Sequence, residues 1–86
     1  MWYVYIVRCK DKSLYTGITT DIARRVSEHN KGKGGACTRV RRPVKLLYQE
    51  QYLTRSEALK REYQIKQCTR AEKLALIKLK ILNKKT

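Results

Sequence analysis

The sequence predicts an α+β domain in which a small, mainly antiparallel sheet of three strands is flanked by helices, in the order ββαβαα. Three observations lead to this prediction. The chain has 86 residues, which is enough for one compact domain and too few for two. Three short runs are rich in β-branched and aromatic residues, and two later segments begin with helix-start signals. We expect one domain over residues 1–82, followed by a basic tail at 83–86.

Residues 2–9 (WYVYIVRC) predict the first strand, and residues 14–18 (LYTGI) predict the second. Bulky side chains alternate on both faces of the first run, so this strand is expected inside the sheet rather than at its edge. Residues 11–13 predict a hairpin turn between the two strands.

A three-residue turn at 11–13 would pair Cys9 with Tyr15. Side chains alternate along a strand, so this register places Tyr5 and Tyr15 on the same face of the sheet. The same face would carry Tyr3, Val7 and Gly17. A two-residue turn would instead separate the two tyrosines, and with them any site that they share.

A helix is predicted to start at Thr20 or Asp21, either of which can act as the N-cap, and to end near Lys31, before Gly32. Its apolar face is predicted to consist of Ile22, Ala23 and Val26. Arg25 and His29 lie one turn apart along the border of that face, and Glu28 is expected to point to solvent.

Residues 31–45 (KGKGGACTRVRRPVK) form a glycine-rich segment with six cations and no anion. We expect these cations to contact phosphates: Lys31, Lys33, Arg39, Arg41, Arg42 and Lys45. Residues 44–53 predict a third strand, and Pro43 stands just before it, where no ladder hydrogen bond is lost.

Two capping boxes, Thr54-x-x-Glu57 and Thr69-x-x-Glu72, predict helices over about 55–67 and 70–82. The second helix is apolar on nearly all sides. We therefore expect part of it to pack against another chain, either in a homodimer or in a larger repair complex.

The net charge of the chain favours some classes of binding partner over others. The chain carries 21 Lys and Arg against seven Asp and Glu, a net charge of +14. Such a field attracts polyanions, and nucleic acid, most simply DNA, is the expected partner. An anionic membrane surface would require an amphipathic surface helix with a lysine-rich face. No signal peptide and no run of about 20 apolar residues is present, so we expect a cytoplasmic protein without membrane association.

The three cysteines do not predict a metal site. Cys9, Cys37 and Cys68 are spaced too widely for the close pairs that zinc sites usually show, even with His29 as a further ligand. We expect small, reduced side chains that are mostly buried.

Few carboxylates are available for chemistry. Four of the seven lie at turn or helix-start positions: Asp11, Asp21, Glu57 and Glu72. Of the others, Glu62 falls near the centre of an apolar stripe on its helix. The stripe is predicted to consist of Ala58, Leu59, Tyr63 and Ile65. An acid in that place needs a cation, a metal or a proton. The alternatives are a buried salt bridge to an arginine and a ligand to a single Mg²⁺, which commonly takes one or two protein carboxylates.

The spacing of several motifs resembles a known family. Tyr3-Val4-Tyr5 followed by Tyr15-Thr16-Gly17 is similar to the paired motifs of the GIY-YIG endonuclease superfamily, in its small single-domain branch. Tyr3 stands where the motif name implies glycine. The family's helix arginine, its frequent histidine and its later glutamate match Arg25, His29 and Glu62.

The resemblance implies a metal-dependent endonuclease that hydrolyses phosphodiester bonds, with a role in repair or recombination. Tyr5 would activate or orient the attacking water, and Tyr15 would position that water or the phosphate. Arg25 would stabilise the transition state, and His29 would assist proton transfer or contact the phosphate. Glu62 would hold one Mg²⁺ or Mn²⁺ ion, while Tyr3 and Gly17 would shape the motif. The residues do not decide whether the substrate is DNA or RNA, or whether single strands, flaps or junctions are preferred. The alternative function is a non-catalytic nucleic-acid-binding module or a subunit of a larger repair complex.

Overall fold

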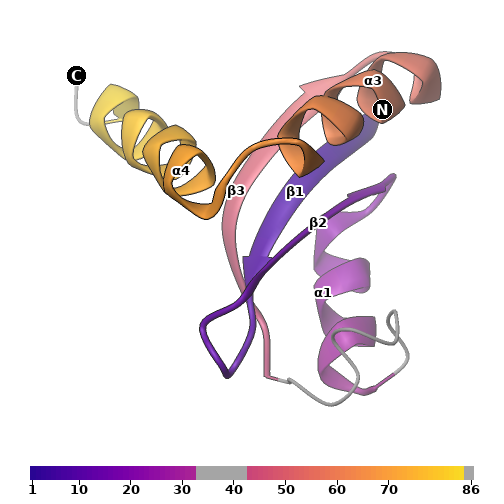
Figure 1. Cartoon of the computed structure of the whole chain (residues 1–86). Coiled ribbons are helices and arrows are strands. Elements are labelled where there is room, and N and C mark those ends of the chain that lie inside the picture. The colour runs from indigo at the N-terminus through magenta and orange to yellow at the C-terminus, as the bar shows by residue number, and fades with distance from the viewer. Residues whose placement is uncertain (33–42, 85–86) are drawn as a thin grey trace.

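The computed structural model describes residues 1–32 and 43–84, and side chains up to residue 80. Its elements follow the predicted order ββαβαα (Figure 1). They are β1 (Trp2–Arg8), β2 (Leu14–Thr19), α1 (Ile22–Asn30), β3 (Lys45–Tyr52), α3 (Arg55–Lys66) and α4 (Arg70–Lys84). The predicted α+β class is confirmed, and each predicted boundary lies within about two residues of the observed one.

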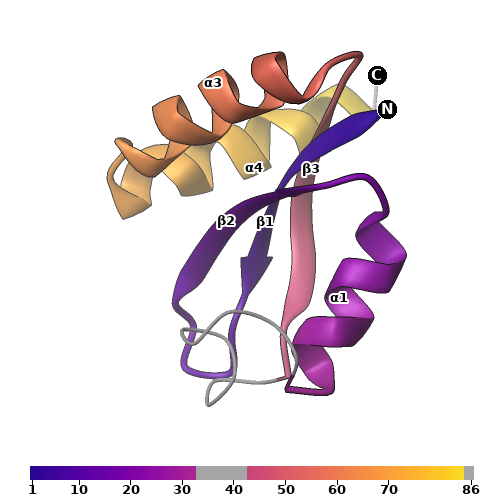
Figure 2. The ribbon, with the colours of Figure 1, turned by 90° about the vertical axis from the view of Figure 1, so that its right-hand side faces the viewer.

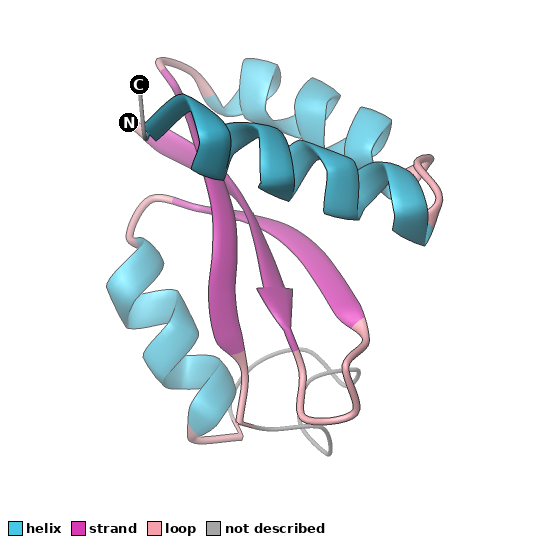
Figure 3. Ribbon diagram, turned by 90° about the vertical axis from the view of Figure 1, so that its left-hand side faces the viewer, coloured by secondary structure: helices cyan, strands magenta, loops and turns pink. Residues whose placement is uncertain are grey.

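The three strands form one antiparallel sheet in the order β2-β1-β3, so β1 is the central strand, as its two bulky faces predicted. Helices α3 and α4 cover one face of this sheet, and α1 lies against the other (Figures 2 and 3). The domain therefore has two hydrophobic clusters, one on each side of β1.

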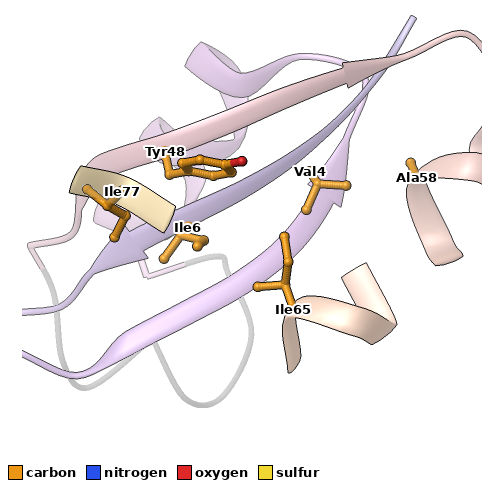
Figure 4. Packing of buried hydrophobic residues seen from close by; sticks show 6 residues of the cluster. All are labelled: Val4, Ile6, Tyr48, Ala58, Ile65 and Ile77. Atoms are coloured by element: carbon orange, nitrogen blue, oxygen red, sulfur yellow. The ribbon is translucent and has the colours of Figure 1, made fainter. Parts of the chain in front are cut away.

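Alternation along β1 divides the core. Val4 and Ile6 point toward α3 and α4, where they pack with Tyr48 and with side chains from both helices (Figure 4). Tyr5 and Val7 point the other way and pack with the half-buried apolar residues of α1. Because β1 supplies both clusters, it fixes the two helical layers relative to each other.

The hairpin turn lies one residue earlier than predicted. Cys9 and Ser13 flank it: Cys9 N–H donates to Ser13 O and Lys12 N–H donates to Cys9 O, both at 2.9 Å. Lys12 adopts the left-handed conformation with φ of 70°, as the last residue of a three-residue hairpin loop commonly does. Tyr15 therefore pairs with Val7, and the expected pairing with Cys9 is wrong.

The loop nevertheless has the predicted odd number of residues, three, which decides the face on which each side chain lies. The loop keeps three residues, so the register moves by two positions and each side chain keeps its face. Tyr5 and Tyr15 share the face that packs against α1, and this prediction is confirmed.

The start and end of α1 agree with the sequence. The Asp21 side chain accepts a hydrogen bond from the backbone N–H of Arg24, and Gly32 has a positive φ of 79° just after the helix. Ile22 and Val26 pack toward the sheet, but Ala23 is exposed, so its assignment to the apolar face is wrong. His29 is fully buried, not at the border of the face.

Two of the four residues predicted to form the buried apolar stripe of α3 are exposed. Ala58 and Ile65 are fully buried, whereas Leu59 is 38% and Tyr63 67% exposed. The helix contacts the sheet along the line that joins Ala58 to Ile65, which are seven residues, or two turns, apart. Leu59 and Tyr63 lie to the sides of this line and face solvent. Both capping hydrogen bonds predicted around Thr69 are present.

The last helix is partly covered by the sheet. Ile77 is buried and Leu76 packs against the same cluster, while Leu74 and Leu79 are exposed. Assembly through this exposed side, in a homodimer or a larger complex, stays a prediction. Within the described ranges, no helix is long and apolar enough to cross a bilayer.

Candidate active site

Three rings meet on the sheet face that packs against α1. Tyr5 and Tyr15 come from β1 and β2, and His29 comes from the last turn of α1. The Tyr5 hydroxyl lies 3.1 Å from His29 Nε2, and the ring centroids of Tyr15 and His29 are 5.4 Å apart. Because two strands and a helix supply the three rings, their arrangement depends on the complete fold.

Gly17 determines where the phenol of Tyr5 lies. The two residues are opposite each other across β1 and β2. A Cβ atom at Gly17 would lie only 2.6 Å from the Tyr5 hydroxyl and 2.8 Å from Tyr5 Cζ. The ring therefore lies across the space above Gly17, pointing from the central strand toward the edge strand.

Arg25 adds the positive charge of the site. It precedes His29 by one helical turn, hydrogen-bonds the Tyr5 side chain, and forms an ion pair with Glu28 at 3.4 Å. Burial acts to lower the pKa of Arg25, but the hydrogen bonds and charges of Tyr5 and Glu28 outweigh it and raise that pKa. Arg25 is thus a permanent cation beside the phenol.

Burial sets the protonation of the Tyr5–His29 pair. It raises the pKa of Tyr5, an effect that the hydrogen bond from Arg25 opposes and the charges of Tyr15 and Glu62 reinforce. Burial also lowers the pKa of His29, and the charge of Arg25 lowers it further. At neutral pH the phenol is therefore protonated and the imidazole neutral. In the His29 tautomer that carries its proton on Nδ1, Nε2 accepts the hydrogen bond from the Tyr5 O–H.

Glu62 belongs to the helical layer on the sheet face opposite to α1. It lies on α3, which packs against β1 and β2, and its side chain is 17% exposed. Its partner is Lys66 at 3.6 Å, so the arginine that the salt-bridge alternative expected is absent from this ion pair. The charge of Glu62 raises the pKa of Tyr5, which links it electrostatically to the three rings.

The donor set suits a loosely held hard cation. Among the described side chains, no group of three His, Cys, Asp or Glu residues gathers as a metal cage. Glu62, whose side chain is ion-paired with Lys66 and 17% exposed, fits a site in which one carboxylate is completed by water and phosphate oxygens. A site for Zn²⁺, which needs three or four protein ligands, has no such support in this part of the chain.

The sequence reasoning missed a polar network on the opposite sheet face. Glu50 accepts hydrogen bonds from the hydroxyls of Tyr48 and Tyr52 and from Arg61 Nε at 2.9 Å. Hydrogen bonds from these partners lower the pKa of Glu50 although burial acts to raise it. Tyr48, Glu50 and Tyr52 are two residues apart along β3, and this period-two spacing could have revealed the shared face.

The predicted phosphate-binding residues are only partly described. Lys31 and Lys45 are exposed, directly after α1 and at the start of β3. Lys33, Arg39, Arg41 and Arg42 lie outside the described residues, as does Cys37. Tyr3 is half-buried on the same face as Tyr5, where it pairs with Thr19.

Proteins similar to this chain include curated sequences and two solved structures with the same architecture. The UPF0213 protein of Staphylococcus aureus strain Mu3 is 62% identical over 76 residues, which cover 88% of this chain and 93% of that protein. The solution NMR structure of the UPF0213 protein from Bacillus halodurans is 44% identical with a TM-score of 0.61, covering 93% of this chain and 86% of that one. An NMR structure from E. faecalis is also 44% identical, with a TM-score of 0.63 and coverage of 93% and 85%.

A family model covers the site as well as the fold. The model of the GIY-YIG catalytic domain matches residues 1–75, which include every strand and the residues that surround Tyr5. With this match and these relatives, the chain belongs to the GIY-YIG catalytic domain family.

Proposed function

We propose that this protein is an endonuclease that hydrolyses phosphodiester bonds in DNA with the help of one divalent metal ion. The observation that carries the proposal is the hydrogen bond between Tyr5 and His29, with Arg25 beside it. A buried phenol joined to a neutral imidazole can pass on a proton, and a neighbouring guanidinium can stabilise a phosphate that gains negative charge.

Water is the nucleophile in this mechanism. Its oxygen forms a bond to phosphorus while its proton moves to the Tyr5 oxygen, and the Tyr5 proton moves to His29 Nε2. This coupled transfer avoids a free tyrosinate, whose formation the raised pKa of Tyr5 disfavours. The bond from phosphorus to the leaving oxygen breaks, that oxygen takes a proton from solvent, and the imidazolium returns its proton to solvent.

The other residues position the phosphate. Arg25 lies where it can offset the charge on the phosphoryl oxygens, and Tyr15, in ring contact with His29, can hold the water or the phosphate by its hydroxyl. Glu62 would hold the metal ion, Mg²⁺ or Mn²⁺, which when bound polarises the phosphate oxygens. The surrounding positive charge supports DNA as substrate and contacts that are largely independent of sequence.

The deciding experiment combines a substrate panel with one variant. Labelled single-stranded, flap and junction substrates in DNA and RNA form are incubated with Mg²⁺, with Mn²⁺ and with EDTA. We expect metal-dependent cleavage by the wild type, and its loss by at least about 100-fold in Glu62→Ala, with binding in EDTA retained. Glu57→Ala, an exposed acid on the same helix, is the matched control and should cleave normally.

Two outcomes would change the assignment. Cleavage by Glu62→Ala at the wild-type rate would make Glu62 structural. Binding without cleavage of any substrate, in either metal, would favour a non-catalytic nucleic-acid-binding module in a repair complex.

A further inference from the structure

A second cationic feature lies at the end of the sheet, away from Arg25. The β1–β2 loop and the start of β3 are side by side there, with Arg8 paired to Lys45 in the sheet (Figures 1 and 3). Together they form a pocket of about 290 Å³, here named the turn pocket. Its lining residues are Arg8, Cys9, Lys10, Lys12, Pro43, Val44 and Lys45.

Among the described residues, four cations and no carboxylate line the turn pocket. Arg8, Lys10, Lys12 and Lys45 are exposed, and none of the four forms an ion pair with a described carboxylate. The nearest acid in sequence, Asp11, does not line the pocket, and its side chain accepts hydrogen bonds from Ser13. Four cations that share one pocket repel each other, and an anion bound between them removes that repulsion.

The shape of the turn pocket favours a phosphate over a base. None of its described lining residues is aromatic, so these residues offer no ring on which a base could stack. Lysines act as flexible point charges, which suits phosphate oxygens that carry no sequence information.

The turn pocket lies just beyond the end of β1, the strand that carries Tyr5. Its buried residues Cys9 and Val44 belong to the hydrophobic cluster that contains Tyr5. Tyr5 and Cys9 are four residues apart on one extended segment, or about 13 Å at about 3.3 Å per residue. The pocket is therefore close enough for a nucleic-acid strand held at Tyr5 to place another of its phosphates there.

We propose that the turn pocket binds a backbone phosphate of the nucleic-acid strand, distinct from the phosphate held at Tyr5. The proposal rests on the proposed function for the position of the cut, but the pocket's affinity for nucleic acid does not depend on cleavage. The pocket thus extends the binding surface from the expected contact at Lys45 to Arg8, Lys10 and Lys12.

Binding in EDTA tests the pocket without catalysis. The variant Lys10→Gln/Lys12→Asn removes two charges, and asparagine tolerates the left-handed conformation at position 12. The control Lys60→Gln/Lys78→Gln removes two exposed charges from α3 and α4. For a labelled single strand, loss of the contact with this one phosphate should reduce the salt slope by about 0.7, so affinity falls about 2.6-fold less between about 50 and 200 mM salt. The control should keep the wild-type slope, and equal slopes in both variants would overturn the proposal.

A scan with single uncharged methylphosphonate linkages locates the phosphate. We expect wild-type affinity to fall at one linkage away from the cleaved bond, and Lys10→Gln/Lys12→Asn to bind equally well with and without that substitution. If cleavage fails but the slope still depends on the two lysines, the proposed function is wrong and the pocket stands. If the wild type cleaves nucleic acid but every linkage affects the wild type and Lys10→Gln/Lys12→Asn equally, the pocket proposal is wrong and the proposed function stands.

Discussion

Tyr5 and Gly17 face each other across the first two strands, and the phenol of Tyr5 occupies the space in which a side chain at Gly17 would begin. Both residues belong to the motifs by which the sequence resembles its family. Their spacing therefore has a steric cause: the glycine lets the tyrosine lie flat over the edge strand and reach His29.

Gly17→Ala should destabilise the protein and displace the phenol. The new methyl group would lie 2.6 Å from the Tyr5 hydroxyl, and Tyr5 is almost fully buried, so it cannot move without disturbing its packing. We expect a loss of about 1–3 kcal/mol in the free energy of unfolding, measured by urea titration. In a Tyr5→Phe background the closest contact is absent and the cost should be smaller, whereas equal costs in both backgrounds would contradict this contact.

His29 should make the protein sensitive to mild acid. Its pKa is lowered from 6.5, chiefly by burial, so as pH falls below about 6.5 the unfolded chain takes up the proton before the folded one does. The stability contributed by the neutral ring is present above pH 6.5 and is lost as pH falls through the lowered folded pKa.

Urea titrations between pH 5 and 7.5 test this dependence. The wild type should lose stability toward the acid end, and His29→Gln, which does not titrate there, should have a flatter profile. A control at Glu57, an exposed acid on another helix (Glu57→Gln), should keep the wild-type profile apart from a small offset. Parallel profiles for wild type and His29→Gln would assign the acid sensitivity to another group.

The sequence predicted the elements of the site better than their burial. Alternation and loop parity are local properties, so the shared face of Tyr5 and Tyr15 could be inferred from them. The position of the loop depended on Asp11, whose side chain accepts hydrogen bonds from Ser13 and favours a turn one residue earlier. The run of β-branched and aromatic residues that predicts the strand does not reveal this turn preference of Asp11.

Contacts between distant segments could not be predicted. His29 is buried because Tyr5, 24 residues away, lies beside it, and helical periodicity alone placed it at a border. Glu50 had no predicted role because its partner Arg61 comes from a helix whose orientation over the sheet was unknown. Leu59 was assigned to the wrong side of that helix for the same reason.

The glycine-rich segment should supply part of the affinity for nucleic acid. Neutralising Arg39, Arg41 and Arg42 together should weaken binding to all sequences alike and flatten the salt dependence by about one unit for each phosphate that is no longer bound. Fluorescence anisotropy with two unrelated DNA sequences measures both effects. A slope equal to that of the wild type would mean that these arginines contact other parts of the protein.

Glu50 should hold α3 onto β3. Its side chain is 17% exposed, and it binds Arg61 through Nε at 2.9 Å and Nη2 at 3.1 Å while accepting the hydroxyls of Tyr48 and Tyr52. Glu50→Gln removes the negative charge and leaves Arg61 without its anionic partner. We expect a loss of about 1–3 kcal/mol, less than for a fully buried pair because Arg61 is 30% exposed. Glu57→Gln, which changes an exposed acid, should cost much less.

The same network should fail in alkali. Burial and the hydrogen bonds to Glu50 raise the pKa of Tyr48 and that of Tyr52 from 10 to about 12. The protonated phenols therefore stabilise the folded state fully below pH 10, and this contribution is lost as pH rises toward 12. Because the carboxylate contributes to both shifts, Glu50→Gln should lose less stability over this range than the wild type does. Equal losses in urea titrations at pH 9 and 11.5 would show that burial alone keeps these phenols protonated.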